Sequence, residues 1–222
     1  MTSTTAAEFF ASIEADAAGS VRELLAADPS LAAARDADGV SALMRARYRS
    51  VRPVMDAILE SGGELDVFEA ASVGDRARLL DLLGYPELVR GFSADGFTAL
   101  HFAAFFGKDS AAEVLLEAGA DPDARGRGWM TGTPLHSAAS GRHARVAALL
   151  VGAGADPNAR QSGGWTPLHG AAHNGDAATA ELLLANGADP AAVNEEGASV
   201  LSLARERGDA ATIAIVLAAL ET

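Results

Sequence analysis

Three histidines recur at nearly constant spacing along this chain and are the first residues to consider for chemistry. His101, His136 and His169 lie 35 and 33 residues apart, and a neutral imidazole can act as a general base or a metal ligand. Neither use finds support, because the sequence has no cysteine, no Gly-x-Ser-x-Gly or phosphate-loop motif and no metal-ligand spacing. His173 and Asp176 would form only a dyad without a nucleophile. The sequence therefore predicts no catalytic residue, no metal, no cofactor and no enzymatic activity.

The elements that must position these histidines form a repeat. Thr-Ala-Leu-His at 98–101 is followed by Thr-Pro-Leu-His at 133–136 and 166–169, and related tetrapeptides begin at Ser41 and Ser199. The threonine suits a helix N-cap, and proline suits the first helical position. Gly107, Gly175 and Gly208 then stand where a left-handed C-cap is wanted. A second apolar helix follows, and Asp-Pro pairs at 121–122, 156–157 and 189–190 begin the turns between repeats.

These motifs resemble those of the ankyrin-repeat family, which they match best over 95–207. The resemblance implies an all-α fold, a solenoid of helix-turn-helix repeats joined by short β-turn hairpins. We expect a single domain, 1–222, of bacterial type with seven repeats, the first and last acting as caps. Their approximate bounds are 1–38, 39–63, 64–95, 96–130, 131–163, 164–196 and 197–222.

The N-terminal half departs from the regular period. Only 24 residues separate Ser41 from the corresponding Leu65, so the hairpin between these repeats is expected to be missing. Two segments, around 21–39 and 79–96, also have similar sequences at a separation of 57 to 58 residues, which suggests a duplicated pair of repeats. Arg142 stands where other repeats have glycine, with Gly141 one place earlier. Either the helix ends one residue sooner or Arg142 adopts a positive φ.

The resemblance implies a structural role for His101, His136 and His169, which would bond locally and tie adjacent repeats together. It also places the partner surface on the hairpin tips and the ends of the first helices. The residues expected there are Phe97, Phe105, Phe106, Arg127, Trp129, Met130, Trp165, His173 and Asn174. Exposed aromatic side chains in one patch are typical of interface anchors, although they could instead pack on the next hairpin.

Four arginines between positions 45 and 52 form a second unusual feature. Stacking of repeats would bring Arg45 to Glu69, which predicts a structural ion pair, and Arg47 could likewise pair with Glu14. The functional alternative is an anion site formed by Tyr48, Arg49 and Arg52 at the missing hairpin. The structural interpretation is favoured.

Composition limits the kinds of partner and of function that we expect. The net charge of −13 disfavours nucleic acid and anionic membranes as partners and favours a basic or mainly apolar protein surface. The first 18 residues lack a basic side chain, so no signal peptide is expected and the protein is predicted to be cytoplasmic. The leading hypothesis is a protein–protein interaction scaffold. An inhibitor or immunity-type protein that blocks one enzyme is the alternative, and a small-molecule binder or enzyme ranks below both. We expect a monomer, with weak dimerisation through the apolar segment 210–220.

Overall fold

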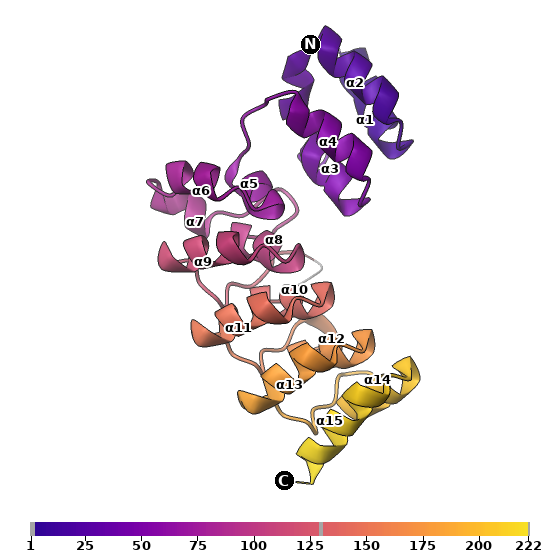
Figure 1. The fold of residues 1–222 in the computed structure, drawn as a ribbon, viewed down its shortest axis with the longest axis vertical. Helices are drawn as coiled ribbons and strands as arrows, with labels where there is room; N and C mark the ends of the chain where they lie inside the picture. The colour runs from indigo at the N-terminus through magenta and orange to yellow at the C-terminus, as the bar shows by residue number, and fades with distance from the viewer. Residues whose placement is uncertain (1–2, 129–130, 222) are drawn as a thin grey trace. The chain divides into compact units, whose positions relative to one another are not determined.

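The computed structural model describes residues 3–128 and 131–221. All the named secondary-structure elements within these ranges are α-helices or 3₁₀-helices. The chain forms two compact units (Figure 1). Unit 1 comprises Met1–Glu69 with Ser93–Asp95, and unit 2 comprises Ala70–Phe92 with Gly96–Thr222. The boundary falls inside helix α5 (Val67–Val73). Each unit is described by itself, and the single domain 1–222 stays a prediction.

Unit 1 is built from two helical pairs. Its elements are α1 (Ser3–Glu14), α2 (Ala18–Ala27), the 3₁₀-helix η1 (Pro29–Ala33), α3 (Ala42–Tyr48) and α4 (Arg52–Glu60). Helix α1 packs on α2 and α3, and α4 packs on α2 and α3. Phe9, Ile13, Leu31 and Leu43 are fully buried between them. The Ser41 hydroxyl caps α3 by accepting the Met44 N–H at 3.3 Å, as expected of a helix start.

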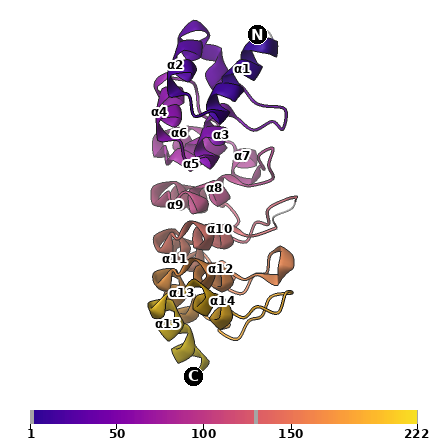
Figure 2. The same ribbon diagram turned by 90° about the vertical axis from the view of Figure 1, so that its right-hand side faces the viewer.

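Unit 2 is a stack of helix pairs in two layers. After α6 (Arg76–Leu82) and α7 (Pro86–Arg90), the inner layer contains α8 (Ala99–Phe105), α10 (Pro134–Gly141), α12 (Pro167–Asn174) and α14 (Val200–Arg207). The outer layer contains α9 (Asp109–Glu117), α11 (Ala144–Gly152), α13 (Ala177–Ala185) and α15 (Ala210–Leu220). Each helix packs on its neighbours within the layer and on its partner in the other layer. The hairpins extend from this stack on the side of the inner helices (Figure 2), and the 3₁₀-helix η2 (Ser162–Gly164) lies in one of them.

Backbone hydrogen bonds join consecutive hairpins of unit 2. The Arg127 N–H donates to the Gly96 carbonyl, and the Glu195 N–H donates to the Gly163 carbonyl, each at 2.9 Å. Arginine side chains add further links, since Arg125 Nη1 donates to the Arg160 carbonyl at 2.6 Å and Arg160 Nη1 to the Val193 carbonyl at 3.0 Å. The hairpins therefore form a continuous row whose spacing follows the helix stack.

The repeat histidines close capping boxes and join neighbouring repeats. His101 Nδ1 accepts the Thr98 N–H at 3.3 Å, which leaves the ring proton on Nε2, and this N–H donates to the Gly132 carbonyl at 3.0 Å. His136 bonds in the same way to Thr133 and to the Trp165 carbonyl. Burial lowers the pKa of both histidines to about 4, so both rings are neutral near pH 7. His169 caps its helix equally, although its Nε2 has no hydrogen-bond partner.

The irregular N-terminal spacing has a simple structural counterpart. Helix α4 ends at Glu60 and α5 begins at Val67, and the two isolated β-bridges, Arg35–Ser41 and Val193–Ser199, lie elsewhere among the described residues. This agrees with the expected missing hairpin. The echo between 21–39 and 79–96 is also visible, because a short helical segment follows the second helix in both places, η1 after α2 and α7 after α6.

The structure decides the two alternatives for Arg142. This residue is the C-cap of α10 and has φ 61° and ψ 44°, the left-handed conformation that Gly175 adopts at the end of α12. Gly141 precedes it inside the helix, at a point where the backbone of α8 comes close. An added Cβ on Gly141 would lie 2.4 Å from the Phe105 carbonyl oxygen. Glycine is therefore used here for close packing, and the capping position is left to an arginine.

Replacing Arg142 by glycine is expected to raise the free energy of unfolding by about 1 kcal/mol, because a side chain in the left-handed region is strained. Urea unfolding of the wild type and Arg142→Gly measures this difference. Arg145→Gly is the matched control, since Arg145 lies in the right-handed helix α11, where glycine costs about 1 kcal/mol. Equal destabilisation by both substitutions would contradict the strain at Arg142.

Candidate functional site

A groove of about 430 Å³ opens on the inner-helix side of unit 2, between α10, α12 and the hairpin that precedes α12. Its lining carries no Asp, Glu, Lys or Arg side chain. The side chains that shape it are Ser140, Gln161, Trp165, Pro167, His173 and Asn174. Three of the expected partner-binding residues, Trp165, His173 and Asn174, therefore share one concavity.

Trp165 forms the aromatic wall of the groove. Its carbonyl accepts the Gln161 N–H at 2.9 Å and the His136 Nε2–H at 3.0 Å, which holds the backbone at the helix entrance. Its ring meets that of His173 edge-on, with centroids 5.7 Å apart and an interplanar angle of 81°. Gly163, at φ 77°, lies against the indole, and an added Cβ there would touch ring atom Cδ1 at 3.5 Å. Trp165 is thus placed by backbone bonds on one side and ring packing on the other.

Some polar atoms of the groove are available to a ligand, whereas the His136 ring and the Ser162 and Thr166 hydroxyls already have hydrogen-bond partners. The Asn174 side-chain nitrogen donates to the carbonyls of Ala139 and Ser140 at 3.2 and 3.3 Å, which orients the amide and leaves its oxygen to accept. Within the described part of the chain, the indole N–H of Trp165 and the side-chain amide of Gln161 have no hydrogen-bond partner. An aromatic wall beside unpaired donors and acceptors suits a peptide segment, which offers both apolar side chains and backbone polar groups.

The other described residues that were expected to bind the partner do not line this groove. Phe105 is 43% exposed and packs edge-on against Phe106, with centroids 5.1 Å apart. Phe97 is half-buried and packs on Phe102 at 6.0 Å, so it supports its own repeat. Arg127 stacks over the ring of Phe92 at 3.6 Å. Trp129 and Met130 lie outside the described residues.

Sequence reasoning missed Gln161 and Pro167. Gln161 lies four residues before Trp165 in a hairpin whose length resembles that of other repeats, and Pro167 belongs to the capping motif. The only available signal was the position of Gln161 on a hairpin next to an aromatic residue. A side chain's entry into a groove depends on how two successive hairpins are spaced, which residue types do not encode.

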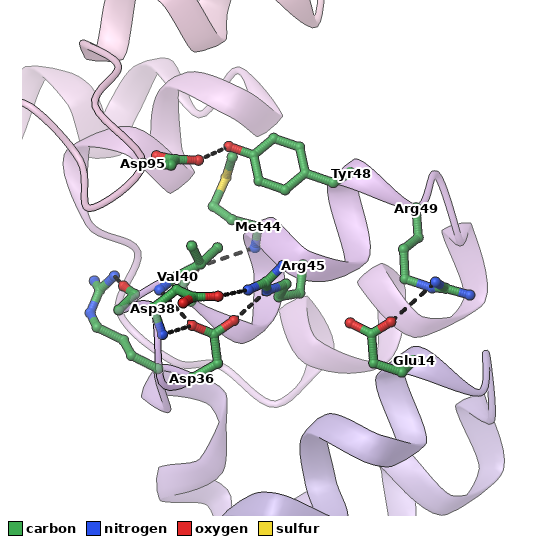
Figure 3. Close-up of polar contacts among 12 residues, drawn as sticks. Glu14, Asp36, Asp38, Val40, Met44, Arg45, Tyr48, Arg49 and Asp95 are labelled. Atoms are coloured by element: carbon green, nitrogen blue, oxygen red, sulfur yellow. Dashed lines mark hydrogen bonds and ion pairs between the residues drawn. The ribbon is translucent and has the colours of Figure 1, made fainter. Parts of the chain in front are cut away.

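The arginines of unit 1 have partners different from those predicted (Figure 3). Arg45 pairs with Asp36, and with Asp38 at 2.7 Å, rather than with Glu69. Asp36 is held in place because it accepts the backbone N–H groups of Asp38 and Val40 at 2.9 and 3.0 Å. Glu69 accepts the Asp66 N–H at 2.9 Å at the start of its own helix, and burial raises its pKa. Arg45 is therefore paired with carboxylates of the preceding loop, and not with Glu69 of the neighbouring repeat.

The expected anion site of Tyr48, Arg49 and Arg52 is already supplied with carboxylates. Arg49 pairs with Asp16 at 2.9 Å and with Glu14, the partner expected for Arg47, at 3.2 Å. The Tyr48 hydroxyl donates to Asp95 (Figure 3). Burial, and then this bond, raises the pKa of Tyr48. An incoming anion would have to displace these carboxylates, so the geometry favours the structural interpretation of this cluster.

The described residues form neither a metal-binding cluster nor a membrane-spanning helix. No group of three or more His, Cys, Asp or Glu side chains within 3–128 and 131–221 is arranged to hold a metal ion. In the same ranges no helix has the length and apolar character needed to cross a membrane.

Comparison with known proteins identifies the repeat. A family model described as ankyrin repeats (3 copies) matches residues 54–161 and again residues 135–220. No curated protein matches the sequence.

Proposed function

Because this chain belongs to the ankyrin-repeat family, whose members are generally protein-binding scaffolds, we propose that it binds a protein partner through the groove around Trp165. The observation that carries the proposal is the groove itself. It combines a half-buried indole and an exposed imidazole with the side-chain amides of Gln161 and Asn174 and the hydroxyl of Ser140. Tryptophan in such a depression is the residue type that most often dominates an interface.

The position of the groove supports the same function. It lies on the side of unit 2 where the hairpins extend, so an extended segment could contact two repeats at once (Figure 2). His136 ties the backbone of Trp165 to the preceding repeat at 3.0 Å. The anchor residue is therefore held before a partner arrives, which lowers the entropic cost of binding.

Site-specific photo-crosslinking tests the proposal. A benzoylphenylalanine at position 173, beside the indole, is expected to capture a protein from a lysate of the source cells. The same group at Ala148, exposed on the outer helix α11, is the control and should capture little. Adding Trp165→Ala should reduce the yield from position 173 at least about tenfold, as expected for loss of a central anchor.

Circular dichroism would establish that the Trp165→Ala protein remains folded, and Gln161→Ala, a change at another residue of the groove lining, offers a milder second variant. Equal capture from positions 148 and 173, or capture that survives both substitutions, would show that the groove is not the binding site.

A further inference from the structure

Charge is unevenly distributed between the two layers of unit 2. The two inner segments that form the groove, 125–142 and 158–175, contain four arginines and no Asp or Glu. These are Arg125, Arg127, Arg142 and Arg160. The outer segments 109–124, 143–157 and 176–190 have one arginine, Arg145, and nine acidic residues. The acidic residues are Asp109, Glu113, Glu117, Asp121, Asp123, Asp156, Asp176, Glu181 and Asp189.

The four inner arginines are exposed, and of these Arg142 lies near enough to a carboxylate, Asp209, to add to the hydrogen bonds that lower the pKa of that group. Arg125 and Arg160 donate to backbone carbonyls along the hairpin row, and Arg127 stacks on Phe92. None of the four forms an ion pair with a carboxylate in the described residues. Arg145 of the outer layer, in contrast, pairs with Asp109 at 2.9 Å. A backbone carbonyl or an aromatic ring does not cancel a unit charge, so the two inner segments keep a net positive charge, with Glu195 of the next hairpin as the carboxylate that lies beside Gly164 and Arg160.

The local charge matters more to a docked partner than the total of −13. Salt screens charges beyond roughly 8 Å at physiological ionic strength, so a segment in the groove is influenced mainly by the arginines around it. The lining of the groove is itself uncharged. It would therefore accept an apolar or aromatic side chain, while carboxylates on either side of that side chain would meet the guanidinium groups.

We infer that the partner presents an acidic segment with an aromatic or aliphatic anchor, an inference that rests on the proposed function of the groove. It reverses the expectation from net charge, which favoured a basic or mainly apolar partner. The nine carboxylates of the outer segments 109–124, 143–157 and 176–190 would keep that side of unit 2 away from the same partner.

Selection from a random dodecapeptide library displayed on phage, with the full chain as bait, tests the chemistry directly. The recovered peptides are expected to be enriched in Asp and Glu around one Phe, Trp or Leu, and Trp165→Ala should abolish their recovery. A synthetic copy of the consensus, labelled with fluorescein, then gives a Kd by anisotropy. Arg127→Gln with Arg142→Gln should weaken binding about tenfold, the size expected for two exposed charge contacts.

The matched control removes two positive charges elsewhere in unit 2. Arg145→Gln with Arg76→Gln changes the net charge equally, and both residues are exposed and lie outside the groove. Its Kd should stay within about twofold of the wild type, since distant surface charges are screened. Equal weakening by the two double variants would overturn the inference.

The selection also separates failure of this inference from failure of the proposed function. Peptides rich in Lys or Arg, or without charge preference, that still require Trp165 would overturn the acidic partner and leave the groove as a binding site. Recovery of no peptide, or of peptides indifferent to Trp165→Ala, would overturn both. A labelled single-stranded DNA 20-mer that binds through Trp165 more tightly than the consensus peptide would replace the protein partner by a nucleic acid.

Discussion

Replacing Gly141 by alanine is expected to lower the free energy of unfolding of unit 2 by about 3 kcal/mol, although the change adds a single methyl group. Gly141 is the last residue of α10 and has an ordinary helical backbone. Its added Cβ would lie 2.4 Å from the Phe105 carbonyl oxygen and 2.5 Å from the His143 ring. A backbone oxygen cannot move aside alone, so α8 and α10 would have to separate and lose buried contact.

Urea unfolding, followed by circular dichroism, would measure the effect of Gly141→Ala. Gly152→Ala is the matched control, because Gly152 ends the outer helix α11 with nothing within 4 Å of its added Cβ. That substitution should stabilise the helix by up to about 1 kcal/mol through the better helix propensity of alanine. If the two variants unfold at the same urea concentration, the close approach of α8 and α10 is not a constraint.

Acidification is expected to destabilise the protein through His101 and His136. Burial lowers the pKa of both to about 4, whereas an unfolded histidine has a pKa near 6.5. Between these two values the unfolded chain binds more protons than the folded one, so stability falls as the pH falls. The contribution is complete above about pH 6.5 and is lost by about pH 4. Each histidine then costs about 3 kcal/mol over the whole window and about 2 kcal/mol by pH 5.

Unfolding midpoints in urea at pH 7.5 and pH 5.0 would measure this loss. The wild type also carries 30 Asp and Glu residues that respond to pH, so the comparison must be made with variants. His136→Gln removes one titrating group, and its stability should change about 2 kcal/mol less between the two pH values. Ala148→Gln, an exposed change that removes no titrating group, should leave the wild-type pH dependence in place. An unchanged slope in His136→Gln would mean that His136 is not held neutral in the fold.

The sequence alone determined the helical repeat and its capping motifs. Thr98 and His101 are three positions apart, and so are the members of the other two pairs, so each capping box closes within one turn of helix. Interactions between residues three positions apart depend only on the local backbone conformation, so they can be predicted from the sequence. A motif that repeats along the chain therefore identifies both the fold class and the family. The missing hairpin before Leu65 was equally readable, because too few residues were present to form one.

Only the tertiary structure decided which side chains meet between repeats. The sequence predicted Glu69 as the partner of Arg45, whereas in the structure the preceding loop brings Asp36 to it. Arg142 likewise occupies the left-handed C-cap position that Gly175 and Gly208 hold in other repeats, while the approach of the α8 backbone requires the glycine at position 141. Spacing between packed helices is a property of the whole stack, and a local motif carries no information about it.

The groove and the distribution of charge also depend on how the helices of unit 2 pack together. Trp165 was identifiable as a hairpin aromatic, but its concavity exists because α10, α12 and one hairpin enclose it. The net charge is a sum over the chain and does not say where the charges lie. Folding places the arginines of 125–142 and 158–175 on the inner layer of unit 2, and the carboxylates of 109–124, 143–157 and 176–190 on its outer side. Sequence therefore determined what unit 2 is built from, and the stacking of its helices decided which chemistry its inner face presents.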